Sequence, residues 1–285
     1  MRHRGFAPAD GLLRLLLATT LFLGLLLLWQ NAHDQSCLAL AAPGVAYLAI
    51  LYGLLEYRLE RKRFVVEYYL DRRSSLRGWL RGSWVALLIS VVGALPLAVF
   101  LAVFAALSRP TDWLFLGIAA ALAPLLFRGL SIYPGSHFRR DGGVGGGRAT
   151  VADVLTARFA GWILVILLAA SYVYFSYTAI RGPGGLIFPD HLELTVEAFR
   201  GRVNSACAAV ERPLRLVAGI EGFAWHFMTR AATEPQIPGG VSAFLWVAFF
   251  LNATVAFTGF VRGLEGCILI MSRLDARNRG GVADV

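Results

Sequence analysis

The sequence predicts an all-α integral membrane protein: a polytopic helical bundle of about six transmembrane helices with both termini in the cytoplasm. Of its 285 residues, 57% are hydrophobic and only 16% are charged, whereas an average soluble domain is about 25% charged. The apolar residues form blocks close to 20 residues long, which is the length that crosses a hydrocarbon core of about 30 Å. These blocks lack the alternation of a barrel strand, so helices are the element that satisfies the backbone in lipid.

Six blocks are long enough, or nearly so, to be spans. The first resembles a signal peptide, but its apolar run is longer than usual and no small-residue cleavage site follows it directly, so we interpret it as a retained anchor. The fourth is the weakest because Arg128 interrupts it. The spans cover residues 12–29, 37–55, 84–107, 113–133, 160–177 and 241–261.

The basic residues predict the topology. The formal net charge is +9, from 27 basic and 18 acidic residues, and all but Lys62 of the basic residues are arginine. With a cytoplasmic amino terminus, the inside segments hold 20 basic and 10 acidic residues. This bias follows the positive-inside rule and predicts a multi-pass protein of a bacterial inner (cytoplasmic) membrane. The positive charge therefore reflects the topology, and the chain contacts membrane lipid. The net charge of +9 no longer indicates nucleic-acid binding.

Two long loops flank the spans of this single membrane domain, 1–285. Loop 56–83 alternates charged with apolar and aromatic residues, which predicts an amphipathic helix, or two, along the cytoplasmic face. That helix is either a solvated element on the membrane surface or a docking element for a cytoplasmic partner. The extracytoplasmic segment 178–240 has helical periodicity and predicts two amphipathic helices that lie on the membrane, dip into it or pack on the span ends.

The sequence lacks the patterns of an enzyme. No catalytic, metal-binding or cofactor-binding spacing occurs, and the glycine-rich stretch 142–147 lacks the lysine of a phosphate loop. The predicted spans hold few ionisable residues apart from Arg14 and Arg128, which disfavours proton- or sodium-coupled carriers. The polar residues of the last span are candidates for a translocation path or for bonds between helices: Asn252, Thr254 and Thr258.

The three cysteines form no metal motif. Cys37 and Cys207 both fall outside the membrane in the predicted topology, so they can pair in an oxidising compartment. We expect two separate apolar thiols instead of this disulfide.

The residues after the second span resemble those at the same place in ABC transporter permeases of the type-2 exporter class. Glu67, Leu70, Ser75, Leu80 and Gly82 fall at matching intervals. The six-span plan and a long outer segment before the last span are also similar to this family. The chain departs from the pattern where Gly-Thr is usual before the glutamate, where proline is usual at position 73 and where lysine often follows the glycine.

The resemblance covers roughly 30 residues and implies a partnership. In the family, this helix couples the membrane subunit, as a dimer, to a separate cytoplasmic ATPase. The residues it assigns to partner coupling are Glu67, Leu70, Arg72, Arg73, Ser75, Arg77 and Gly82.

Two functions remain open on the sequence. One is a transport permease, driven by a separate ATPase, that moves an amphiphilic or polymeric substrate. The other is a non-catalytic membrane subunit or scaffold of a respiratory, secretion or envelope complex.

Overall fold

Six membrane-spanning helices form the body of the protein. The computed structural model describes residues 8–69, 84–132, 151–175, 185–233 and 239–280, and within these ranges it contains helices and no strand. Six of the helices are long and apolar enough to cross a membrane, which confirms the predicted helical bundle. They are α1 (Pro8–Ala32), α2 (Ala41–Tyr69), α4 (Trp84–Leu107), α5 (Pro110–Ile132), α6 (Val151–Phe175) and α9 (Gly239–Gly280).

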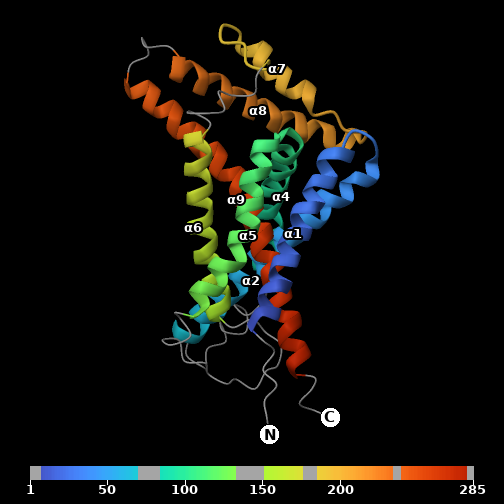
Figure 1. Ribbon diagram of the computed structural model, residues 1–285, viewed down its shortest axis with the longest axis vertical. Helices are drawn as coiled ribbons and strands as arrows, with labels where there is room; N and C mark the ends of the chain where they lie inside the picture. The colour runs from blue at the N-terminus through green and yellow to red at the C-terminus, as the bar shows by residue number, and fades with distance from the viewer. Residues whose placement is uncertain (1–7, 70–83, 133–150, 176–184, 234–238, 281–285) are drawn as a thin grey trace.

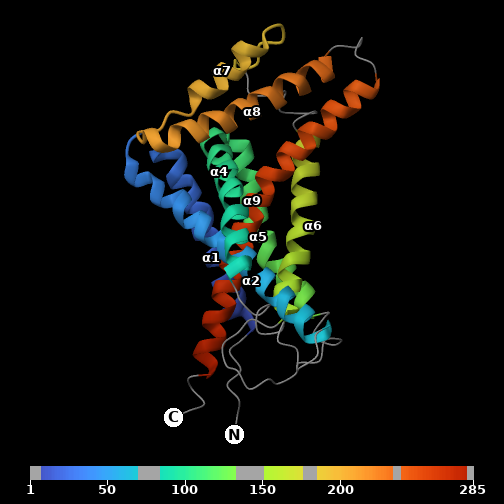
Figure 2. The same cartoon turned by 180° about the vertical axis from the view of Figure 1, so that it is seen from behind.

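The bundle has two distinct ends. Helix α1 begins, and α9 ends, at what we call the inner end (Figure 1). At the opposite, outer end, α7 (Leu192–Arg202) and α8 (Ala208–Thr233) lie across the tops of the spanning helices (Figures 1 and 2). A short helix, η1 (Cys37–Leu40), joins α1 to α2 at this outer end. The outer segment therefore contains the two helices that its periodicity predicts.

Two spanning helices are much longer than their apolar stretches. Helix α2 runs to Tyr69, so residues 56–69 continue the second span and do not begin a separate surface helix. The reason is that no glycine or proline occurs between residues 54 and 77 to end the helix. The rest of the predicted docking element, 70–83, lies outside the described residues. Helix α9 has 42 residues and runs to Gly280, well past the predicted end at residue 261.

Helix α9 is the centre of the bundle and packs against α1, α2, α4, α5, α6 and α8. Three of its glycines permit close approach. A Cβ at Gly259 would lie 2.6 Å from the Leu97 carbonyl oxygen of α4, and one at Gly263 or Gly266 would overlap the Phe22 ring or the Ala49 backbone. Small residues at such crossings let helix backbones meet in a membrane, so these glycines set the spacing of the bundle.

The outer helices form a hairpin fastened by polar contacts. The Phe188 N–H donates to the Thr195 hydroxyl (2.9 Å), and that hydroxyl lies 3.4 Å from His226 Nδ1 of α8. Helix α8 begins at Ala208, five residues before Pro213, and is amphipathic. Its buried face, which contacts α4, α7 and α9, includes Leu214, Val217, Ala218 and Trp225.

Candidate functional site: two buried clusters of charge

The inner half of the bundle contains a buried ion pair within α9. Arg262 and Glu265 lie about one helical turn apart and pair directly, and their side chains are only 1% and 6% exposed. From α6, the Arg158 guanidinium reaches the same Glu265 carboxylate at 3.4 Å. One carboxylate thus holds two guanidinium groups, and it connects α6 to α9.

The residues around this pair are shaped to accommodate it. Gly161 of α6 faces Glu265 so closely that any Cβ would collide with the carboxylate. The Arg262 guanidinium lies over the Trp162 ring at 5.0 Å, and the Arg158 guanidinium over the Tyr57 ring at 4.5 Å. Cation–π contacts of this kind compensate partly for the lost water. The Arg262 Nη2 group nevertheless has no hydrogen-bond partner among the described residues.

A second ion pair extends the network to α2. Glu56 of α2 pairs with Arg273 of α9, whose guanidinium lies 5.4 Å from the centre of the Tyr52 ring. Glu60, one turn further along α2, is also buried. We call the five residues that these contacts join on three helices the inner charge network: Glu56, Arg158, Arg262, Glu265 and Arg273.

The expectation that the spans hold almost no ionisable residues apart from Arg14 and Arg128 is therefore wrong. Glu265 and Arg262 follow the apolar run of the last span, where a hydropathy window ends, yet α9 continues and the bundle buries them. The same holds for Glu56 of α2. Buried carboxylates are thus present, and their supposed absence no longer counts against ion-coupled transport.

The outer end contains a second polar cluster, around the start of α5. The Arg109 backbone N–H donates to Asp112 Oδ2 at 2.8 Å, which caps the helix, and the Arg109 guanidinium lies 5.6 Å from the Trp225 ring centre of α8. Tyr172 of α6 makes a side-chain hydrogen bond with Arg109. Asp112 is 3% exposed, and its Oδ1 has no hydrogen-bond partner within the described ranges. The cluster therefore joins α5, α6 and the outer hairpin.

Glu221 of α8 completes this outer cluster. Its side chain lines a cavity of about 20 Å³ together with Tyr172 and Trp225, which is room for about one water molecule. The pKa of Glu221 is raised to about 7, chiefly by burial and also by the nearby Asp112 carboxylate, whereas a hydrogen bond from Trp225 and the Arg109 charge oppose the change. The carboxyl group of Glu221 thus titrates near neutral pH, at the contact between the hairpin and the bundle.

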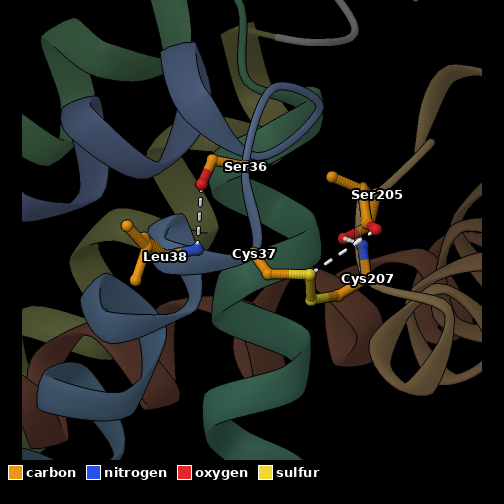
Figure 3. The surroundings of a disulfide bond; sticks show 6 residues. Ser36, Cys37, Leu38, Ser205 and Cys207 are labelled. Carbon is orange, nitrogen blue, oxygen red and sulfur yellow. Dashed lines mark hydrogen bonds between the residues drawn. A yellow bond between two sulfur atoms is a disulfide. The ribbon is translucent and has the colours of Figure 1, made fainter.

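A disulfide joins Cys37 of η1 to Cys207, the residue before α8 (Figure 3). Their Cα atoms are 5.2 Å apart although 170 residues separate them in sequence. The expectation of two separate thiols is therefore wrong. The chain leaves α7 at Arg202, and the turn that follows brings Cys207 to the α1–η1 corner, where the Ala206 N–H donates to the His33 carbonyl oxygen. Cys267 of α9 remains a free thiol.

The residues assigned to sites from the sequence are not gathered into one described site. Glu67 lies on the inner extension of α2, and its side chain is outside the described residues, as are Leu70, Arg72, Arg73, Ser75, Arg77 and Gly82. The Thr254 and Thr258 hydroxyls both donate at 2.7 Å to carbonyl oxygens of their own helix. The side chain of Asn252 is outside the described residues as well.

Sequence reasoning missed both buried clusters. Comparisons of the chain with protein-family models, with curated proteins and with solved structures find no match.

Proposed function

We propose that the chain is the membrane permease subunit of a transporter that a separate cytoplasmic ATPase drives, moving an amphiphilic or polymeric substrate. One observation carries the proposal: the inner charge network connects the inner extension of α2, where the docking residues begin, to α6 and α9. A subunit that is driven from outside needs such a rigid connection between its docking element and its spanning helices.

The connection has two branches. Through the Glu56–Arg273 pair, a displacement of α2 acts directly on α9. Through the contact of Tyr57 with Arg158, it acts on α6 and, by way of Glu265, on α9 again. Because the Glu56 and Glu265 carboxylates are buried, separating either from its arginine would leave an uncompensated charge in the bundle, so the three helices move together. A push on residues 67–82 would in this way reach the outer end of the bundle.

Two features support the proposed orientation, with the inner end in the cytoplasm of a bacterial cell. The disulfide lies at the outer end, and disulfides persist in oxidising compartments such as the periplasm. The excess of arginine lies in the segments that adjoin the inner end, as the positive-inside rule requires.

The test is affinity purification of the tagged chain from native membranes, followed by an ATPase assay. The proposal expects an ATPase to copurify, and Glu67→Ala to remove most of it. Glu193→Ala, on the outer helix α7, is the matched control and should retain it. A preparation without ATPase, or equal ATPase recovery with both variants, would contradict the proposal.

The outer hairpin favours a second candidate, a non-catalytic subunit of a larger membrane complex. Leu216, Ile220 and Phe223 form an apolar stripe on α8, and each is between 43% and 61% exposed. A photoreactive residue at position 220 tests this alternative. A scaffold subunit should capture one particular foreign membrane protein there, and no ATPase should copurify.

A further inference from the structure

The outer hairpin of α7 and α8 is fastened to the bundle at two places along α8. At the start of α8, the Cys37–Cys207 disulfide ties the hairpin to η1. About 27 Å further along the helix, the Trp225 ring packs edge-on against Phe249 of α9, with 5.0 Å between the ring centres, and the Arg109 guanidinium lies over it at 5.6 Å. This second contact is noncovalent, so the hairpin can open there while the disulfide holds its start in place.

Glu221 lies one helical turn before Trp225, at the same noncovalent contact. It lines the cavity of about 20 Å³, where the lining residues of α4 and α9 are all apolar. Among the described residues, the titratable and charged groups that act on Glu221 are Tyr172 of α6 and, at the start of α5, Asp112 and Arg109. Glu221 is only partly buried, so protons from the compartment at the outer end reach it without crossing the bundle.

These groups offer one positive charge to two carboxyl groups. The Arg109 charge is committed to Asp112, because Arg109 Nε lies 3.8 Å from Asp112 Oδ2, and Asp112 is 3% exposed with no described donor to its Oδ1. On α7, Glu197 and Arg200 pair with each other at the outer surface. An ionised Glu221 would therefore add a second carboxylate, without an ion pair among the described residues, to this apolar contact. That state costs free energy unless water or a proton reaches the carboxylate, so the closed hairpin fits a neutral Glu221.

We propose that Glu221 is a proton-binding latch: the outer hairpin lies closed on α4 and α9 while this carboxyl group holds a proton, and opens about Cys207 when the proton leaves to water. No covalent bond of the chain other than this O–H changes. Opening hydrates the carboxylate and separates it from Asp112. The pKa of Glu221 is about 7 with the hairpin closed and 4.5 for an exposed glutamate, so the latch responds between mildly acidic and neutral pH. It requires only the hairpin and the bundle, so it is independent of the proposed transport function.

The test measures how fast a thiol beneath the hairpin reacts with a water-soluble maleimide, using the full chain in nanodiscs. Ala253→Cys places that thiol in the α9 wall of the cavity, where the native side chain is 4% exposed. Cys267→Ser removes the free native thiol. Glu193→Cys, at an exposed position of α7, is the reference at each pH. The ratio of the two rates corrects for the effect of pH on the reagent and on an exposed thiol.

The ratio should rise roughly thirtyfold between about pH 5.5 and about pH 8, because opening is linked to release of the Glu221 proton. Glu221→Gln keeps a neutral side chain of the same size and should leave the ratio low at both pH values; Glu221→Met replaces it if that variant does not fold. Asp112→Asn removes a charge that raises the pKa of Glu221, so the rise should be smaller. Glu197→Gln, which neutralises an exposed carboxylate of α7, is the matched control and should keep the full rise.

Three results would overturn the proposal. The first is a rate ratio for Ala253→Cys that is the same at both pH values. The second is an undiminished rise in the neutral variant of Glu221, which would assign the pH dependence to another group. The third is an equal rise for Ala119→Cys, whose native side chain is fully buried in α5, because the whole bundle and not the hairpin would then be opening.

Discussion

The buried pair within α9 allows a sharp test of how the inner charge network holds the bundle together. Glu265→Gln removes the carboxylate that neutralises Arg262, whose side chain is 1% exposed and cannot reach water. Breaking a buried pair by removing one partner costs about 3–5 kcal/mol, because the remaining charge stays in the interior. We expect Arg262→Met to cost less, because Glu265 keeps the Arg158 guanidinium at 3.4 Å. The double variant should lose less stability than the two single losses added together, with a coupling free energy of about 1–3 kcal/mol.

Reversible unfolding in bicelles, followed by circular dichroism, measures the four free energies of unfolding in this cycle. Glu197→Gln is the matched control: its carboxylate pairs with Arg200 and Arg215 on the outer surface and is 60% exposed. Exposed pairs contribute at most about 1 kcal/mol, so this control should change little. If the double variant of Arg262 and Glu265 loses the sum of the two single losses, the pair is not coupled and the reasoning is refuted.

Three further predictions concern packing, the disulfide and pH. Gly259→Ala should lower the free energy of unfolding by about 1–3 kcal/mol, because its Cβ would lie 2.6 Å from a carbonyl oxygen. Gly24→Ala should leave the stability unchanged, because a Cβ at that position meets nothing within 4 Å. Equal melting temperatures for the two variants would argue against the packing role of Gly259. Alkylation of the unfolded chain without reductant should modify one of the three cysteines, Cys267, and two or more modified cysteines would exclude the Cys37–Cys207 bond. Cys37→Ser should destabilise the outer hairpin by about 2–4 kcal/mol, measured by hydrogen exchange. The pKa of Glu221 in the folded protein is about 7, whereas that of an exposed glutamate is 4.5, so only the folded chain keeps this proton at the pH values between them. Stability should therefore fall as the pH rises between these values, by up to about 3 kcal/mol, and Glu221→Gln should remove that slope in thermal melting at about pH 5 and about pH 8. An unchanged slope in the variant would assign it to another group.

The six spans could be predicted from the sequence because hydropathy is a local property. Each span contains its own run of apolar residues, and the two outer helices reveal themselves by periodicity alone. The residue at which each helix ends depends less on the local sequence. Helix α9 continues beyond Val261 because Glu265, Arg158 and Gly161 meet there, and only the packing of α6 against α9 creates that meeting.

The two clusters of charge could not be predicted either, because they also depend on contacts between residues that are distant in the sequence. Glu56 and Arg273 lie more than 200 residues apart in sequence, and no pattern around either one indicates the other. A signal was present, however. An arginine and a glutamate one turn apart, each followed by a glycine and directly after an apolar run, as in residues 261–266, suggest a buried pair on a closely packed helix. The docking residues 70–83 remain a prediction.

The length of α9 has a mechanical consequence. At 1.5 Å per residue its 42 residues extend about 63 Å, roughly twice the hydrocarbon core. The tight crossings at Gly259, Gly263 and Gly266 form a fulcrum, with about 30 Å of helix on the outer side and about 20 Å on the inner side. A tilt of about 10° about that fulcrum would swing the outer tip by about 5 Å in one direction and the inner tip by about 4 Å in the other. The last helix thus has the proportions of a lever, with the outer hairpin on its long arm and Arg273 on its short one.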